Sequence, residues 1–281
     1  MNCKAYAKIN LSLAIKGVRE DGYHLLEMVN LPLELHDSID VELMPQGYAT
    51  HVICDDIRLM GLRSNLCTKA VEALKERYGF TRGFLIRIHK NIPFAAGLGG
   101  GSSDGAAVLK AVNSILKLGA SDEELKEIGL KLGSDIPFFF ANKPAIVTGI
   151  GEEVKTISGT KPYYCLLIKP DQGLSTKEVY EKARTPERSI DTDAVVSGLK
   201  EGNDLKIAKA RGNDLFKPAC SLLPEVGDIV STLRQDGFPV SAMSGSGSCC
   251  FALSKDQKSL KNEAKKFEKR GYNVVLTKTI A

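Results

Sequence analysis

A run of glycine and serine residues is the strongest chemical signal in this sequence. The segment 93–103 reads PFAAGLGGGSS, and apolar residues at helical spacing follow it from Val108 to Leu116. Consecutive glycines let the backbone approach an anion closely, and the start of a helix adds partial positive charge. We therefore expect residues 93–103 to hold phosphate. Ser102 or Ser103 could instead serve only as the cap of the helix.

Other motifs with a similar appearance do not fit the surrounding residues. A Walker A loop needs a lysine directly after its last glycine, and here Ser102 stands there. A Rossmann fingerprint needs a second strand ending in an acid about 20 residues further on, but residues 104–117 and 121–132 are predicted helices. The downstream signatures of protein kinases are not found. Ser103 sits in a G-x-S-x-G pattern, but all four histidines precede it, which excludes the α/β-hydrolase order.

Lys8, Asn10 and Asp135 are candidate reactive side chains. Residues 5–15 alternate apolar and polar side chains, which predicts a strand with Lys8 and Asn10 on one face, ~6.6 Å apart. These two side chains could line a cleft or simply face solvent. Asp135 precedes the apolar run IPFFF, which could desolvate its carboxylate and make it a base. The other interpretation of Asp135 is a helix cap.

The elements that would position these residues follow from periodicity and capping signals. We expect strands at 5–15, 39–43, 84–88, 164–168 and 273–280. We expect helices at 66–78, 104–117, 121–132 and 256–270. Ser64 or Asn65 can cap the first helix, and Ser121 with Glu124 forms a capping box for the third. The stretch SGTKP at 158–162 is the candidate domain boundary, and the second part predicts a small α+β layer.

Composition and charge limit the classes of function. The chain has 281 residues, of which 43% are hydrophobic and 26% charged, as in an ordinary globular protein of one or two domains. A net charge of +4 is too small over this length to indicate a nucleic-acid or membrane surface. Seven cysteines without a C-x₂-C pair favour free thiols in a reducing compartment. Polar residues interrupt the N-terminus, and no apolar run is long enough to span a membrane, so we expect a cytoplasmic protein.

Three motifs in this order resemble those of the GHMP kinase superfamily. They are AKINLSL at 7–13, the glycine segment at 93–103, and MSGSGSCCFAL at 243–253. Two further segments, REDGYHLLEMV at 19–29 and LGSDIPFFF at 132–140, are similar to one branch of the superfamily. That branch uses ATP to phosphorylate the 2-hydroxyl of a cytidine diphosphate-linked methylerythritol in non-mevalonate isoprenoid precursor synthesis. The resemblance covers nearly the whole chain.

The resemblance implies an α+β, two-domain GHMP kinase fold. Residues 1–158 would form the N-terminal ATP-binding domain, similar to ribosomal protein S5 domain 2, and residues 159–281 a ferredoxin-like C-terminal domain. ATP and Mg²⁺ would be the cofactors, and the partner a small-molecule substrate rather than nucleic acid or membrane. The chain would act as a monomer or homodimer.

The resemblance also implies roles for individual residues. Lys8 and Asp135 match the catalytic pair of the superfamily. ATP would be bound by Pro93, Phe94, Ala95, Ala96, Gly97, Leu98, Gly99, Gly100, Gly101, Ser102, Ser103, Asn65 and Lys90. The substrate would be bound by Asn10, Tyr23, His24, Thr176 and Tyr180, with Tyr23 and His24 at the cytosine ring. No acidic metal ligand is evident near the loop, so Mg²⁺ would rest on phosphate oxygens, water and a loop serine.

Two alternatives remain open. The first is another GHMP-type kinase, acting on a homoserine-, mevalonate- or sugar-like alcohol. The second is a non-catalytic sensor that binds a nucleotide. The Lys8–Asp135 pair argues against the sensor, because a sensor has no use for a base.

Overall fold

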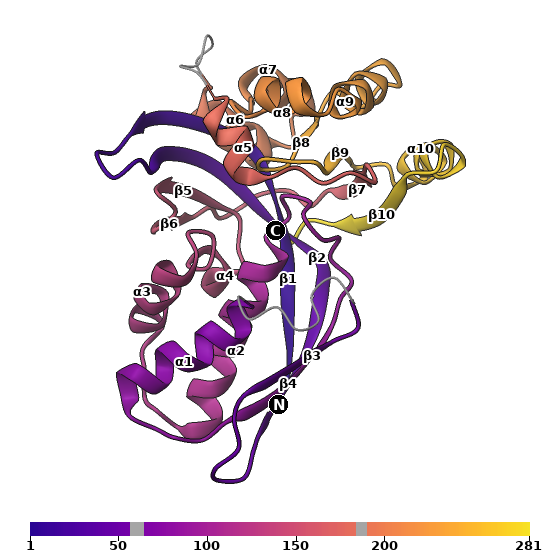
Figure 1. Ribbon diagram of the computed structural model, residues 1–281. Helices are drawn as coiled ribbons and strands as arrows, with labels where there is room; N and C mark the ends of the chain where they lie inside the picture. The colour runs from indigo at the N-terminus through magenta and orange to yellow at the C-terminus, as the bar shows by residue number, and fades with distance from the viewer. Residues whose placement is uncertain (57–64, 184–189) are drawn as a thin grey trace.

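Two β-sheets form the framework of the computed structural model, which describes residues 1–56, 65–183 and 190–281 (Figure 1). The first sheet has the strand order β3-β4-β2-β5-β6, with β1 paired to β2, and the second has the order β10-β7-β9-β8. The strands of the first sheet are β1 (Asn2–Val18), β2 (His24–Leu43), β3 (His51–Cys54), β4 (Phe84–His89), β5 (Ala145–Gly149) and β6 (Glu153–Thr156). Those of the second are β7 (Tyr164–Lys169), β8 (Ser241–Met243), β9 (Cys250–Ser254) and β10 (Asn273–Lys278).

Helices pack against both sheets, so the expected α+β content is confirmed (Figure 1). The helices beside the first sheet are α1 (Leu66–Tyr78), α2 (Gly100–Leu116), α3 (Asp122–Leu132) and α4 (Phe138–Ala141). Those of the second part are α5 (Thr176–Glu181), α6 (Thr192–Glu201), α7 (Asp204–Ala210), α8 (Phe216–Leu222), α9 (Glu225–Gln235) and α10 (Gln257–Lys269). The strands of the second sheet are all antiparallel, and α9 and α10 pack against them.

Most predicted helix ends are confirmed. Asn65 caps α1 by accepting a hydrogen bond from the backbone N–H of Cys67, and Gly79 ends the helix in a left-handed conformation. The capping box at the start of α3 is present, with Ser121 and Glu124 bonded reciprocally. Ser64, the alternative cap of α1, lies outside the described residues.

Strand β2 differs from the predicted short strand at 39–43, because it is one strand of 20 residues that begins at His24. It pairs with β1 over most of its length, with β5 through Leu26 to Asn30, and with β4 through Ser38 to Leu43. Its middle lies between two hydrophobic cores. Met28 belongs to one core and Leu31 to the other, so the alternation of a one-sided strand is lost there.

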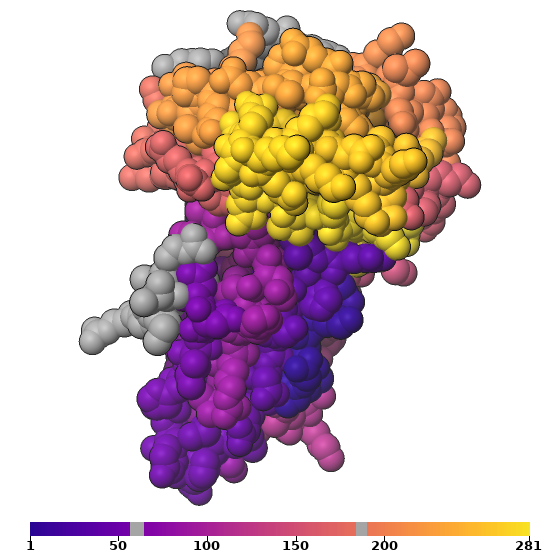
Figure 2. All heavy atoms as spheres, turned by 90° about the vertical axis from the view of Figure 1, so that its right-hand side faces the viewer, coloured from indigo at the N-terminus to yellow at the C-terminus, as the bar shows by residue number. Residues whose placement is uncertain are grey.

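The β1–β2 hairpin connects the two parts of the molecule (Figure 1). Its apolar side chains Ile9, Leu11 and Leu31 belong to the same core as Leu167 of β7 and Phe251 of β9. Figure 2 shows the C-terminal residues, in yellow, stacked on the N-terminal part, in indigo and purple. The chain passes from the first sheet to the second between β6 and β7, and the boundary at residue 158 stays a prediction.

In the described ranges, no helix combines the length with the apolar character that a crossing of the bilayer requires.

Candidate active site

A cavity of about 450 Å³ lies where the glycine segment, β1 and the start of α5 meet. Most of the predicted site residues line it: Lys8, Asn10, Asn65, Lys90, the whole run from Pro93 to Ser102, Asp135, Thr176 and Tyr180. Ser103, Tyr23 and His24 are not among its lining residues. The structure therefore brings together groups from both parts of the chain at one place.

The glycine segment forms one wall of the cavity, and the chain then continues into helix α2. Helix α2 begins at Gly100, and its cap is Gly99, with a φ of 72°. Ser102 and Ser103 therefore lie inside the first turn, and the interpretation of either as the cap is wrong. Gly101 borders open space, since a Cβ built there would meet only a Leu66 methyl at 3.9 Å. Backbone N–H groups at this helix start can face an anion.

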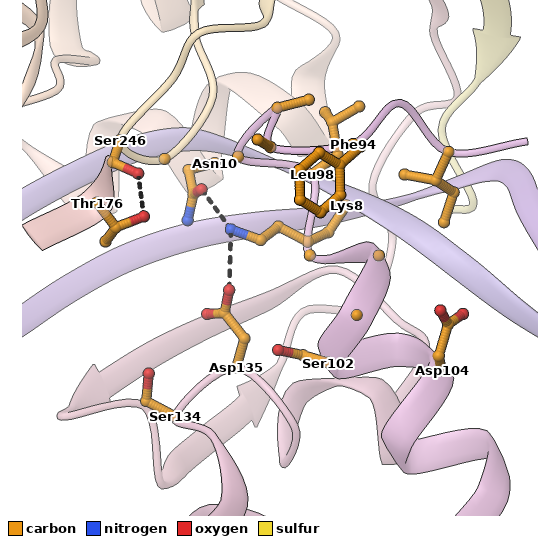
Figure 3. A pocket seen from close by; sticks show the side chains of 18 of the residues that line it. Lys8, Asn10, Phe94, Leu98, Ser102, Asp104, Ser134, Asp135, Thr176 and Ser246 are labelled. Carbon is orange, nitrogen blue, oxygen red and sulfur yellow. Dashed lines mark hydrogen bonds and ion pairs between the residues drawn. The ribbon is translucent and has the colours of Figure 1, made fainter. Parts of the chain in front are cut away.

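Lys8 and Asp135 form an ion pair at the cavity, with 3.4 Å between Lys8 Nζ and Asp135 Oδ2 (Figure 3). The Lys8 side chain is 4% exposed, whereas that of Asp135 is 32% exposed. Helix α4 follows Asp135, but its cap is Pro137, so the interpretation of Asp135 as a cap is wrong. The carboxylate is thus held by one cation and remains open to the cavity.

Asn10 orients the Lys8 side chain from the same strand. Its Oδ1 accepts a hydrogen bond from Lys8 Nζ at 2.6 Å. Its Nδ2 donates to Asn30 Oδ1 on β2 at 2.7 Å, which fixes which end of the amide faces the lysine. Asn10 is 1% exposed, so these contacts are shielded from competing water.

Lys90 lies in a second charged group, which we call the Lys90 cluster (Asp37, Lys90 and Asp104). Lys90 Nζ contacts Asp104 Oδ2 at 2.8 Å and also pairs with Asp37. Burial lowers the pKa of Lys90, but the two carboxylates outweigh burial and raise it. Burial raises the pKa of Asp104 to about 7, and Asp104 Oδ1 has no hydrogen-bond partner in the described part of the chain. The cluster joins the start of α2 to β2.

The second part of the chain contributes hydroxyl and aromatic groups. Thr176 Oγ1 and Ser246 Oγ lie 2.9 Å apart at the cavity wall (Figure 3). The ring of Tyr180 lies 4.8 Å from the ring of His24, measured between centroids. Burial, followed by the charge of Asp135, raises the pKa of the Tyr180 phenol. Tyr23 is 58% exposed and lies outside the lining, at the turn before β2.

Several lining residues were given no role by sequence reasoning. They include Asp104, Ser134 and Ser246, together with the apolar side chains of Leu13, Leu26 and Met28. Asp104 carries a usable signal, because it is a charged residue among small and apolar ones at the start of a helix. Ser134 and Ser246 carry no such signal, since serine is common in turns.

The fold and the cavity agree with the family models that match this chain. The model for the GHMP kinases N terminal domain matches residues 65–143, and the model for the GHMP kinases C terminal matches residues 195–273. The chain belongs to the GHMP kinase superfamily, with its two-domain fold.

Relatives that match over the full length narrow this assignment. A 4-diphosphocytidyl-2-C-methyl-D-erythritol kinase from Clostridium botulinum (strain Kyoto / Type A2) is 37% identical over 282 residues, covering 100% of both chains. One from Clostridium tetani has the same identity and coverage. A crystal structure of 4-(cytidine 5'-diphospho)-2C-methyl-D-erythritol kinase is 30% identical over 100% of both chains, with a TM-score of 0.84. Within the superfamily, the chain belongs to this family of kinases.

A more distant structure shares the fold. The homoserine kinase of Cytophaga hutchinsonii has a TM-score of 0.72 at 16% identity, with 98% of this chain and 94% of that chain covered. This likeness concerns the fold alone.

Proposed function

We propose that the protein transfers the terminal phosphate of ATP to the 2-hydroxyl of 4-diphosphocytidyl-2-C-methyl-D-erythritol, a step in non-mevalonate isoprenoid precursor synthesis. The observation that carries the proposal is the partly exposed carboxylate of Asp135, held by buried Lys8, in the cavity that the glycine segment borders. The full-length relatives named for this activity support the choice of substrate.

The glycine segment would bind the phosphates of ATP. Phosphoryl transfer asks a protein mainly for positioning and for neutralisation of charge, because the phosphoryl group itself does most of the chemistry. Backbone N–H groups around Gly97 to Ser102 would supply the contacts, and the start of α2 the favourable dipole. Asn65 and Lys90 would border the nucleotide as part of the cavity wall.

Asp135 would accept the proton of the substrate hydroxyl, while Lys8 orients the carboxylate of Asp135. A carboxylate with one cation partner keeps an oxygen free for a second hydrogen bond. The ammonium of Lys8 lies 3.4 Å from that carboxylate, so it can also stabilise negative charge that develops on the transferring group. Asn10 would hold Lys8 in place through the 2.6 Å hydrogen bond.

The oxygen donors at the cavity fit Mg²⁺. Mg²⁺ commonly keeps several waters and uses few protein ligands beside the phosphates of a substrate. The hydroxyl of Ser102 lies at the start of α2, on the side that faces Asp135 (Figure 3). In the described part of the chain no group of three or more His, Cys, Asp or Glu could hold a metal ion by itself. Ser102 and the phosphates would therefore hold Mg²⁺, which offsets phosphate charge when bound.

The substrate would occupy the side of the cavity that the second part of the chain closes. The cytosine ring would lie by the aromatic pair of His24 and Tyr180, with Tyr23 closing over it from the turn. Stacking of a base on an aromatic ring is worth ~1–3 kcal/mol. Thr176 would contact the polar part of the substrate. We also propose that the protein works in the cytoplasm as a monomer or homodimer, without nucleic-acid or membrane partners.

A substrate panel tests this proposal directly. The protein is incubated with ATP and Mg²⁺ and, separately, with the cytidine substrate, free methylerythritol phosphate, homoserine, mevalonate and galactose, while ADP release is followed. Activity only with the cytidine substrate supports the proposal. Activity on another alcohol would be consistent with the GHMP kinase superfamily but would refute the proposed reaction on the cytidine substrate. Nucleotide binding with no turnover on any alcohol would favour a sensor.

A further inference from the structure

We call the glycine-rich turn at 243–249 the second glycine turn. The proposed mechanism gives it no role, yet it contacts both the glycine segment and strand β1. The hydroxyl of Ser244 donates a hydrogen bond at 2.9 Å to the carbonyl of Gly97 in the glycine segment (93–103), which we also call the phosphate loop. The same hydroxyl accepts one from the backbone N–H of Asn10 on β1 at 3.2 Å. Ser244 is 0% exposed, so a single buried hydroxyl joins the catalytic strand to the loop.

The backbones at this junction lie too close for side chains. A Cβ on Gly97, whose φ is +71°, would lie 2.1 Å from the carbonyl oxygen of Ser244. A Cβ on Gly245, whose φ is +56°, would lie 3.2 Å from Asn10 Oδ1 and from Gly97 O. The glycines therefore permit a direct contact between the turn, the loop and the strand.

Two hydrogen bonds, one to the carbonyl of Gly97 and one to the carbonyl of Leu98, fix the loop at consecutive peptide groups. Gly97 O is held by Ser244, and the next carbonyl, that of Leu98, accepts from the backbone N–H of Lys8 at 3.0 Å. In a planar trans peptide the C=O and the following N–H point in opposite directions. Holding Gly97 O toward the turn therefore directs the N–H of Leu98 away from the turn.

We propose that Ser244 is a positioning residue, which sets the register between the phosphate loop and the strand that carries Lys8 and Asn10. The proposal rests on the function proposed above. A small displacement of the phosphate loop relative to strand β1 would misalign the terminal phosphate and the catalytic pair without removing either of them. Ser244 is not among the residues that line the cavity, so it would act through the backbone of Gly97 and Asn10.

The test compares Ser244→Ala with a matched variant of the same turn, Ser248→Ala. Ser248 is also 0% exposed, and its hydroxyl donates one hydrogen bond, to the carbonyl of Gln172 at 2.8 Å, outside the phosphate loop. We expect Ser244→Ala to lower kcat by about tenfold or more and to weaken ATP binding several-fold, because both contacts to the hydroxyl are lost. Ser248→Ala should keep kcat and the calorimetric affinity for ATP, with a similar decrease in Tm.

Equal kcat in the two alanine variants, with equal loss of Tm, would overturn the proposal, because Ser244 would then act only in stability. Ser244→Cys provides a second measurement should Ser244→Ala fail to fold, since a thiol is close in size but a weaker hydrogen-bonding group. An unchanged kcat/KM in Ser244→Cys would likewise overturn the proposal. Inactivity of the unmutated protein on the cytidine substrate is a separate result, and it would refute the proposed function instead.

Discussion

Two lysine–carboxylate groups border the same cavity and differ in how completely their charges are satisfied. Lys8 pairs with one carboxylate at 3.4 Å, and that carboxylate, Asp135, is 32% exposed. Lys90 pairs with two carboxylates whose side chains are at most 6% exposed. Asp37, one of the two, also accepts backbone hydrogen bonds from Asn91 and Ile92.

We propose that this difference separates a group that can react, Lys8 with Asp135, from a group that mainly holds structure, the Lys90 cluster. A buried cluster whose cation is fully shared offers little to a ligand, but it connects the elements that carry it. A carboxylate with one partner and access to the cavity can accept a proton and then release it. The same residue types therefore support two roles, and burial decides between them.

Removing the cation of the Lys90 cluster should have the largest effect on stability. Lys90→Met leaves two buried carboxylates side by side, and breaking a buried ion pair costs about 3–5 kcal/mol. We expect the free energy of unfolding, measured with urea, to decrease by that order. Lys8→Met should decrease it less, since Asp135 can be solvated. A Lys90→Met protein of unchanged stability with weak ATP binding would make Lys90 a nucleotide ligand instead.

Neutralising the open carboxylate should have the largest effect on turnover. Asp135→Asn keeps the size of the side chain but removes the basic oxygen, so kcat should decrease by about 10²-fold or more. ATP affinity, measured by calorimetry, should stay nearly unchanged. Retention of most of the turnover would show that Asp135 does not act on the substrate proton.

A methyl group added to the phosphate loop tests its contact with ATP. Gly101→Ala places a Cβ 3.9 Å from a Leu66 methyl and otherwise in open space, so the fold should be kept. If phosphate lies against this backbone, ATP affinity should decrease by about tenfold, which corresponds to about 1.4 kcal/mol. Gly17→Ala is the matched control, because its Cβ would also lie 3.9 Å from a leucine methyl, away from the cavity. Equal ATP affinity in both variants would show that phosphate does not lie against the backbone of Gly101.

The pH dependence of stability should report the buried acid of the Lys90 cluster. Burial raises the pKa of Asp104 to about 7 from an ordinary value of about 3.9, so the folded protein binds its proton more tightly than the unfolded chain does. This contribution to stability is complete below about pH 4 and is lost as the pH rises to about 7. It changes by at most about 1.4 kcal/mol per pH unit.

Asp104→Asn should make the free energy of unfolding less dependent on pH in this range, because an amide does not titrate. Urea unfolding at several values between about pH 5 and 7.5 measures this slope. Identical slopes for the variant and the unmutated protein would mean that Asp104 stays ionised beside Lys90.

Local patterns predicted much of this molecule, because they depend on neighbours in the sequence. The caps at Asn65 and Ser121 and the alternating strand around Lys8 follow from such patterns. The cavity-lining run from Pro93 to Ser102 was also found this way. The start of α2 was placed too late, because Gly99 caps the helix without a side chain.

Tertiary contacts could not be predicted from residue types. Asp37 meets Lys90 and Asp104 only because β2, β4 and α2 come together, and nothing near Asp37 in the sequence indicates a charged partner. The pairing of Lys8 with Asp135 was expected from the resemblance to GHMP kinases rather than from physics. The contact of Ser244 with both Asn10 and Gly97 depends on the fold in the same way.

The β1–β2 hairpin determines how the chain can be divided. Ile9, Leu11 and Leu31 are at most 2% exposed, and they share one core with Leu167 and Phe251, which lie far along the chain. A gene fragment that stops at residue 158 would encode the hairpin without the C-terminal strands that bury its apolar side chains. The apolar patch left on such a fragment would favour aggregation in the cell. We therefore expect the two parts of the chain to fold together and not as separate fragments.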